Sequence, residues 1–447
     1  MKKRNLIILI IMMFIVLGVL YVTFILPKSQ KTDTATTVDD SGGSSNFFSD
    51  IFPFLKNKND GSNTNTENNP DISGYVPPAE GPVKDMILYK VSSMPIAGYG
   101  TYYKERFVDV PEKTAEEIEE ISTVINNKPT APETEQVLAL RYVDKSNGNI
   151  YQTFADKILE SKFTNTVILN IHEAFLSNNA QNVIMRFLKS DGKTISTYAG
   201  ALEKERFADD YISTTELTGS FLPDNITDLS VNSVSSKMFY LFNNKDYSVG
   251  INANISGEGK VQVFDSAYSE WLSQYANQNT ITVTTKAGSG VNGYMYKINP
   301  NKKDFEKVIG PLPGLTTLTS PSGNLVLYAD DQLNLFIYNL SNKETRKISI
   351  KTLPEKCAWS EDDTYLYCAM PRDIPSTLLP DSWYQGAVSF SDQIWKIDAE
   401  TLNTGLIIDP LQTNGGEDID GIKLTLKDDY LFFINKKDNF LWELKLK

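Results

Sequence analysis

A hairpin pattern that recurs beyond residue 84 constrains the fold of this chain more than any other feature. Four segments align with one another by eye, and they begin at Ser233, Ser320, Ser360 and Thr425. In each segment a hydroxyl residue opens a tight polar turn, and an aromatic or β-branched strand follows. Short strands separated by polar turns at a spacing of about 40 residues indicate a repeat architecture built from β-sheet.

Further strands complete each unit. The last three segments continue with a short loop and another strand, "NLFIYNL", "DQIWKID" or "NFLWELKL", and units before the chain end add a fourth, such as "TRKISI" or "TGLIID". Four antiparallel strands per unit make a propeller blade. The predicted fold class is therefore all-β, a seven-bladed β-propeller over residues 84–447. Its blades begin near Val91, Val167, Ile226, Glu270, Gly314, Glu355 and Ile419.

Two of the hairpins resemble those of a known family. "SPSGNLVLYA" (residues 320–329) and "WSEDDTYLYCA" (residues 359–369) are close to W-S-P-D-G-x-x-L-x-Y, the first-hairpin pattern of WD40-like and TolB-like β-propellers. The chain also resembles uncharacterised membrane-anchored propeller proteins of small-genome bacteria in "CAWSEDDTYLYCAMP", "WYQGAVSFSDQIWKID" and "LRYVDKSNGNIYQTFAD". The resemblance covers most of residues 84–447. It implies the propeller fold and carries no established activity.

The last predicted blade has only three strands before Lys447. A strand without a blade, "DMILYKV" (residues 85–91), precedes the first blade. We expect this strand to complete the last blade, so that one N-terminal and three C-terminal strands close the ring. Closure removes a long exposed sheet edge, which would otherwise invite aggregation.

The N-terminus predicts a membrane anchor. Residues 6–26 form an uncharged run of 21 residues, and a helix of that length spans about 32 Å, enough for the roughly 30 Å hydrocarbon core. A cleaved signal peptide is the alternative, but its apolar region has only about 7 to 15 residues. The basic residues Lys2, Lys3 and Arg4 keep residues 1–5 in the cytoplasm and direct the rest of the chain outward. The predicted location is the cell membrane, with a single pass and an extracytoplasmic propeller.

A disordered tether is predicted for residues 27–83. They are rich in Ser, Thr, Asn, Asp and Gly and hold too little apolar surface to offset the entropy of ordering. The Phe-rich island "NFFSDIFPFL" (residues 46–55) either touches its own domain or the membrane surface, or docks a partner. The net charge of the chain is −13, and residues 1–26 contain no acidic residue, so the exported part is strongly acidic. We therefore expect no nucleic-acid partner.

Strand direction places three long segments on one face of the ring, which we call the open face. They are the loops between second and third strands at residues 285–294 and 370–393 and the blade-to-blade loop at residues 409–421. An acidic insert at residues 111–122, predicted to be helical, lies on the other face. Aromatic residues in the longest loop either contact a ligand or pin the loop onto its own blade. The candidate binding residues are Trp383, Tyr384, Gln385, Tyr294, Glu417 and Asp418.

The sequence predicts no catalytic residue, no metal site and no cofactor. His172 is the only histidine, and its place in "ILNIHEAFL" predicts a structural residue on the inner strand of blade two. No G-x-S-x-G elbow is present to expose a nucleophile. The "GEDIDG" run (residues 416–421) falls short of the D-x-D-x-D-G calcium loop with its later Glu, so it predicts a solvated acidic loop.

Cys357 and Cys368 are the only cysteines. They flank an acidic turn centred between Glu361 and Asp363, and because cross-strand partners in a hairpin have a constant index sum, the two residues face each other. Opposed antiparallel Cα atoms lie about 4.5 to 5.5 Å apart, within disulfide reach. An extracytoplasmic location is oxidising, and no further cysteine or neighbouring histidine completes a zinc site. We predict a structural disulfide.

The predicted function is non-catalytic. A membrane-tethered extracytoplasmic propeller would use its open face to bind a protein or a cell-envelope polymer. The alternative is an exported hydrolase or a glycan-binding lectin that uses the same face, since propellers host both kinds of function. Polar side chains with shifted pKa values in the central channel would favour the enzyme, and a flat, aromatic-rimmed face would favour the scaffold.

Overall fold

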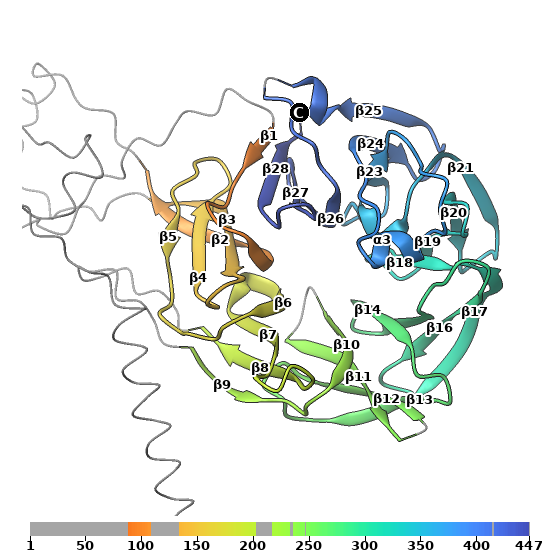
Figure 1. The fold of residues 1–447 in the computed structure, drawn as a ribbon, viewed down its shortest axis with the longest axis horizontal. Coiled ribbons are helices and arrows are strands. Elements are labelled where there is room, and N and C mark those ends of the chain that lie inside the picture. The colour runs from red at the N-terminus through yellow and green to blue at the C-terminus, as the bar shows by residue number, and fades with distance from the viewer. Residues whose placement is uncertain are drawn as a thin grey trace, which may run out of the picture. The chain divides into compact units, whose positions relative to one another are not determined.

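The computed structural model of the chain describes residues 88–108, 134–202, 217–232, 236–245, 247–413 and 415–446. All of them belong to one compact unit, Ile72–Lys447. They form seven four-stranded antiparallel sheets arranged as blades around a central opening (Figure 1). The predicted all-β, seven-bladed propeller is therefore confirmed.

In every blade the strands pair in order from the innermost outward. Blade one contains β2 (Ile96–Phe107), β3 (Thr134–Asp144), β4 (Ile150–Phe154) and β5 (Ser161–Lys162). Blade two contains β6 (Ile171–Leu176), β7 (Asn182–Leu188), β8 (Ile195–Ala201) and β9 (Thr218–Phe221). Blade three contains β10 (Ile226–Val231), β11 (Lys237–Asn244), β12 (Tyr247–Asn254) and β13 (Val261–Ser266). Blade four contains β14 (Trp271–Asn277), β15 (Thr280–Thr285), β16 (Asn292–Asn299) and β17 (Asp304–Pro313).

The remaining blades follow the same order. Blade five contains β18 (Thr316–Thr319), β19 (Leu325–Ala329), β20 (Asn334–Asn339) and β21 (Thr345–Lys351). Blade six contains β22 (Cys357–Trp359), β23 (Tyr365–Pro371), β24 (Asp392–Asp398) and β25 (Thr404–Ile408). Blade seven contains β26 (Gly421–Lys427), β27 (Tyr430–Asn435) and β28 (Leu441–Lys445), and β1 (Leu88–Lys90) is its outermost strand. The short helical elements are η3 (Asn178–Ala180), η4 (Pro354–Lys356), α3 (Asp381–Tyr384) and η5 (Pro410–Gln412).

The hydrophobic core lies between neighbouring blades. The second strand of a blade is buried on both faces, and its sequence is accordingly a continuous apolar run, as in "MFYLF" of β11 and "LFFI" of β27. The outermost strands β17, β21 and β25 are mostly exposed. Polar residues dominate β21 and the first half of β17, whereas β25 exposes Leu406 and Ile407. This gradient explains why the sequence alternates clearly in some strands and not in others.

The ring closes through the N-terminal strand. The strand predicted at residues 85–91 is described from Leu88 to Lys90, where it pairs antiparallel with β28. Leu88 lies opposite Leu444 and is buried against it in the core of blade seven. The edge of β28 is thereby covered, as the closure argument requires.

The recurring hydroxyl residues organise the first hairpins. Ser360 accepts a hydrogen bond at Oγ from the backbone N–H of Tyr365 at 2.9 Å, which fixes the turn between β22 and β23. Ser320 does the same for Leu325 at 3.2 Å, and its Oγ also donates to Asp363 of the next blade at 2.7 Å. One short motif therefore sets both the hairpin and the contact between blades five and six.

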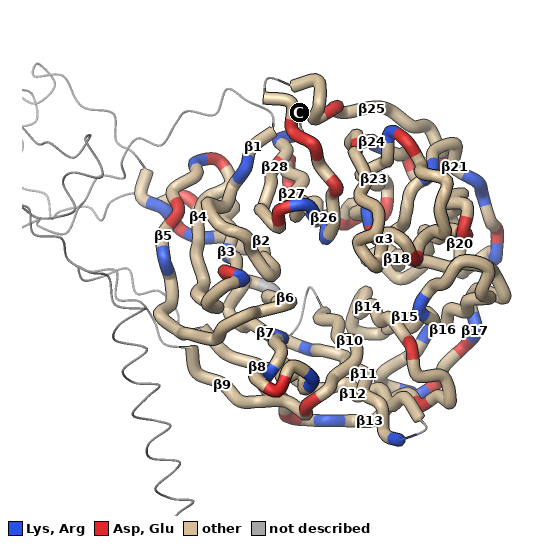
Figure 2. The backbone as a smooth tube through the Cα atoms, in the orientation of Figure 1, with Lys and Arg blue, Asp and Glu red and all other residues tan. Residues whose placement is uncertain are grey.

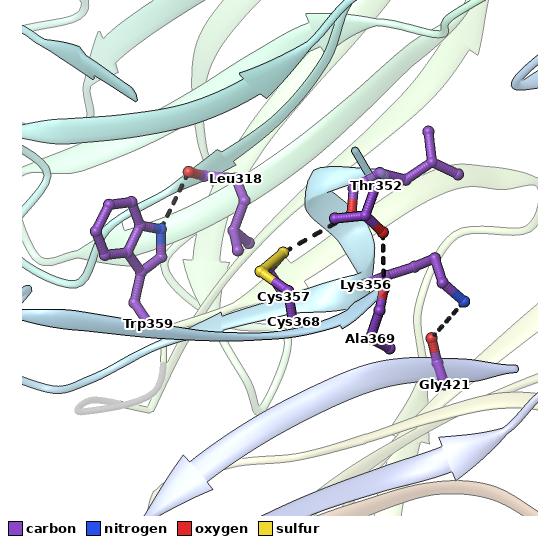
Figure 3. Close-up of a disulfide and its surroundings, with 9 residues drawn as sticks. Leu318, Thr352, Lys356, Cys357, Trp359, Cys368, Ala369 and Gly421 are labelled. Atoms are coloured by element: carbon purple, nitrogen blue, oxygen red, sulfur yellow. Dashed lines mark hydrogen bonds between the residues drawn. A yellow bond between two sulfur atoms is a disulfide. The ribbon is translucent and has the colours of Figure 1, made fainter. Parts of the chain in front are cut away.

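The disulfide is confirmed. Cys357 and Cys368 are direct partners in the register of β22 and β23, with Cα atoms 4.0 Å apart and a bond between the sulfur atoms (Figure 3). Both residues are buried in the core between blades five and six. Close by, Trp359 donates from Nε1 to the carbonyl of Leu318 at 3.3 Å, so this hairpin is also tied to blade five.

Several predicted segments lie outside the described residues. They are the membrane span at 6–26, the tether at 27–83 and the acidic insert at 111–122. In the part of the chain that is described, the helices are too short or too polar to cross a bilayer. The three predicted loops at residues 285–294, 370–393 and 409–421 do connect the expected strands and so share the open face.

Candidate functional site

Bulges gather at one part of the open face, where the first strand of each blade begins. The strands β2, β6, β10 and β26 each carry a register shift near their start, and the extra residues there are Ala97 in β2, His172 in β6, Thr227 in β10, and one of Lys423 and Leu424 in β26. No such shift occurs in β18 or β22, and the shift in β14 lies at its far end. A bulge bends its strand and redirects side chains. Blades seven, one, two and three, which are neighbours in the ring, are therefore distinct from the other three.

A cleft of about 620 Å³ lies beside these bulges and is lined by blades one and two. Six of the twelve lining residues are apolar and six are polar. The apolar residues are Met94, Pro95, Ile171, Phe187, Leu188 and Ile195. The polar residues are Asp144, Lys145, Ser146, Asn170, His172 and Arg186. Cavities that bind small ligands have about this volume and this mixture of side chains.

An ion-pair network joins the inner strands of blades seven and two beside the cleft. Arg186 donates from Nη1 to Glu173 at 2.8 Å, and Lys423 of β26 donates to the other oxygen of the same carboxylate at 2.9 Å. The Lys423–Glu173 pair joins blades seven and two across blade one, whose Tyr99 donates to the carbonyl of Lys423 at 2.6 Å. Burial alone would raise the pKa of Glu173, but Lys423 and Arg186 together hold it below the ordinary value. Glu173 is therefore a carboxylate anion at neutral pH.

The pKa of a second carboxyl group near this network is shifted in the opposite direction. Asp228 of β10 accepts two hydrogen bonds from Ser273 of β14, from the backbone N–H at 2.7 Å and from Oγ at 2.5 Å. Burial raises the pKa of Asp228 to about 6, the negative charge of Glu173 adds to the effect, and the bonds from Ser273 oppose it. Two neighbouring carboxyl groups thus have separated pKa values, a pattern that acid–base sites share with purely structural networks. Figure 2 shows the acidic and basic positions on the inner strands around the central opening.

Lys145 brings a further positive charge to the cleft. Its Nζ donates to Asn439 of blade seven at 3.1 Å, and burial together with the charge of Lys423 lowers its pKa. Asp144, the carboxylate of the cleft, accepts hydrogen bonds from Ser146 and Asn147 within its own turn. Its oxygen atoms are therefore engaged in turn formation.

The aromatic loop that was predicted from the sequence lies on the other half of the open face. Trp383, at 4% exposure, is buried against Phe390, with ring centroids 6.1 Å apart. Its Nε1 donates to the carboxylate of Asp420 at 3.0 Å, and Lys436 lies over its ring at 3.9 Å from the centroid. These contacts pin the loop of residues 370–393 onto blades six and seven.

The other predicted residues are distributed around this loop. Tyr384 is half-buried and donates to Glu355, while Gln385 is exposed. Burial raises the pKa of both Tyr384 and Glu355. The long loop also meets the loop of blade four, because the backbone N–H of Ser289 donates to Asp381 at 2.6 Å.

The remaining candidates are Tyr294, Glu417 and Asp418. Tyr294 is half-buried on β16, with Lys307 over its ring at 5.7 Å from the centroid. Glu417 is half-buried, and the exposed Asp418 pairs with Lys437 at 2.5 Å and accepts a hydrogen bond from Ser391. Ligand contact by the predicted residues stays a prediction, and these residues do not line the cleft of blades one and two.

A buried lysine supports the loop of residues 370–393 through two carboxyl groups. Lys356 of η4 is fully buried, and its Nζ lies 2.7 Å from Asp392 and contacts Asp420. The same Nζ donates to the carbonyl of Gly421 at 3.0 Å (Figure 3). Burial raises the pKa of Asp392 to about 6, although Lys356 opposes the rise. For Asp420, burial is outweighed by Lys356 and by hydrogen bonds that include those of Phe390 and Trp383, so its pKa is lowered.

Sequence reasoning missed the residues of the cleft. The sequence predicts a structural strand residue at His172, whereas its side chain is exposed and lines the cleft. A signal was present, because His172 and Glu173 are two adjacent polar residues in an otherwise apolar strand, where strict alternation fails. A bulge produces such a break in period. Among the described residues, no group of three or more His, Cys, Asp or Glu side chains is placed to hold a metal ion.

Fold and site together define a class: a seven-bladed β-propeller whose open face carries a cleft of polar and apolar residues next to an ion-pair network on the inner strands. No protein-family model matches the sequence. No curated protein matches it either.

Solved structures do resemble the chain. One is an oligogalacturonate lyase from Vibrio parahaemolyticus, with 12% sequence identity and a TM-score of 0.44 over 70% of this chain and 86% of that one. Another is an oligogalacturonate lyase in complex with manganese, with 11% identity and a TM-score of 0.44 over 69% of this chain and 86% of that one. Similarity at this level carries no inference about the activity of this chain.

Proposed function

We propose that the chain is a membrane-tethered extracytoplasmic propeller that binds a protein or a cell-envelope polymer on its open face without transforming it. The cleft of about 620 Å³ between blades one and two is the observation on which this proposal rests. It combines an apolar wall with converging polar groups, which is how proteins fix and orient a ligand. A polymer or peptide segment could enter it from the open face.

The proposed location rests on the sequence. Residues 6–26 would anchor the chain, residues 1–5 would stay in the cytoplasm, and residues 27–83 would hold the propeller away from the membrane. The Cys357–Cys368 disulfide is consistent with an oxidising compartment outside the cytoplasm.

Site-specific photo-crosslinking in native membranes tests the proposal. A p-benzoylphenylalanine residue at Leu188, which is 47% exposed in the cleft, is compared with one at Leu406, which is 48% exposed on the outer strand β25. We expect a discrete covalent adduct from position 188 and none from position 406. Equal labelling at both positions, or no adduct at position 188, would contradict the proposal.

A second candidate function is an exported hydrolase, and the carboxyl groups of Glu173 and Asp228 favour it. One is held anionic and the other has its pKa raised to about 6, as a general acid requires. The test is release of soluble fragments from isolated envelope polymer by the native chain and by Asp228→Asn, which keeps an acceptor for Ser273. Release by the native chain alone would establish the hydrolase, and no release by either would leave the binding function.

A further inference from the structure

The cleft carries more basic than acidic groups, although the chain as a whole has a net charge of −13. Lys145 and Arg186 line it together with His172, and Lys423 lies close enough to affect Lys145 electrostatically. Of the nearby carboxylates, Glu173 is shared between Arg186 and Lys423. Asp144 accepts hydrogen bonds within its own turn, and Asp228, a third nearby carboxylate, accepts them from Ser273. Lys145 donates to the neutral Asn439, so its charge is the one that a negatively charged ligand would meet in the cleft.

Arg186 has a donor that no protein group satisfies in the described part of the chain. Its side chain is 10% exposed, and its terminal nitrogens donate to Glu173 at 2.8 Å and to the carbonyl of Ile226 at 2.7 Å. The buried Nε has no hydrogen-bond partner among the described residues. Buried donors are rarely left unpaired, and this one belongs to a side chain that lines the cleft.

The apolar residues of the cleft select for an apolar body. Phe187, Ile195 and Met94 line it, and Leu188 keeps 47% of its surface exposed there. A ligand that covers this apolar surface removes it from water, which favours binding. A fully hydrated small anion would leave it uncovered.

We propose that the cleft binds an organic carboxylate with an apolar body, whose carboxylate lies against Lys145 and His172 and whose carbon atoms pack on Phe187 and Leu188. This inference rests on the proposed function, because it names the chemistry of the ligand for the same cleft. The chemistry could come from a free small acid or from the C-terminal residue of a peptide, and the experiment separates these sources.

Binding of matched acids and amides tests the inference. The full-length chain in mild detergent is titrated calorimetrically with 3-phenylpropionate and its amide, and separately with N-acetyl-Ala-Leu as the free acid and as the C-terminal amide. We expect at least one acid to bind at least tenfold more tightly than its amide, and the pair that shows the preference identifies the source. Equal affinities within both pairs, or no binding by either acid, would overturn the inference.

Charge-removing variants locate the site. We expect Lys145→Met to reduce the preference for the acid to less than threefold and His172→Gln to reduce it partly. The matched control is Lys286→Met, which removes a lysine of blade four that is 53% exposed, and it should leave the preference unchanged. An unchanged preference in both cleft variants would overturn the inference. If the crosslink from position 188 persists while no acid is preferred, the proposed function survives and the carboxylate chemistry is wrong.

Discussion

Replacing Lys356 with Met removes the cation that lies between two buried carboxylates. The Nζ of Lys356 is 2.7 Å from Asp392 and contacts Asp420, and all three side chains have 0% exposure. Removing one partner of a buried ion pair costs about 3 to 5 kcal/mol, because the remaining charge is left without compensation. Total stabilities are about 5 to 15 kcal/mol, so the variant would lose a large share of its stability.

The pKa of Asp392 adds a pH dependence to this cost. Because that pKa is raised to about 6, Asp392 can take up a proton at pH 5, and the variant then keeps only one uncompensated charge. Lys356 opposes the rise in the native chain, so its removal raises the pKa of Asp392 further, and the two carboxyl groups of the variant carry more negative charge at pH 8 than at pH 5. We therefore expect a loss of about 3 kcal/mol at pH 5 and about 5 kcal/mol at pH 8.

Urea denaturation followed by tryptophan fluorescence measures the effect, since the ring centroid of Trp383 is 5.2 Å from the Nζ of Lys356. The matched control is Lys286→Met, which breaks an ion pair with Glu270 whose side chains are 53% and 64% exposed. Exposed pairs contribute about 0 to 1 kcal/mol, so the control is expected to stay near native stability. A loss below about 1 kcal/mol for Lys356→Met would refute the reasoning, because it lies far outside the range for an uncompensated buried charge.

Three further predictions concern ring closure, the disulfide and the channel. Deleting residues 84–91 uncovers the edge of β28, so we expect a much lower melting temperature than after deleting tether residues 30–80, and equal melting temperatures would contradict closure by β1. Replacing both Cys357 and Cys368 with Ala should lower the free energy of unfolding by about 3 kcal/mol. Two free thiols in non-reducing mass spectrometry of the native chain would contradict this prediction, because the disulfide would then be absent. The pKa of Asp228 is about 6 in the folded chain and near 3.8 in the unfolded chain. Its contribution to the free energy of unfolding is therefore fully present below pH 4 and is lost as the pH rises through 6. Asp228→Asn should therefore gain up to about 3 kcal/mol relative to the native chain between pH 4 and pH 7, and a constant difference across that range would count against the raised pKa.

The fold was predictable because the information for it is local. A hydroxyl residue such as Ser320 or Ser360 fixes a hairpin over five residues, and an apolar run marks the second strand. The disulfide followed from the same local register, since Cys357 and Cys368 face each other in one hairpin. Repetition of one hairpin then sets the blade, and ring closure follows from the need to cover the last edge.

The cleft was not predictable in this way, because its residues come from separate blades. Lys423 and Glu173 are 250 residues apart in the sequence and form one ion pair. The bulge that places His172 requires a comparison of two strands, which a single strand does not supply. Lys356 was missed for a related reason: a lysine in a polar loop suggests a surface residue, and only the converging loops of blades six and seven bury it.

The two halves of the open face differ in how far their own side chains cover them. On blades six and seven, Asp420 accepts bonds from Lys356, Trp383 and Phe390, so the loop is held by contacts within the protein. On blades one and two, Leu188 stays exposed in the cleft of about 620 Å³. Exposed apolar surface in a cleft is where a ligand gains most from burial. The aromatic loop is thus best understood as the rigid side of the face, and the bulged side with its cleft is where binding is expected.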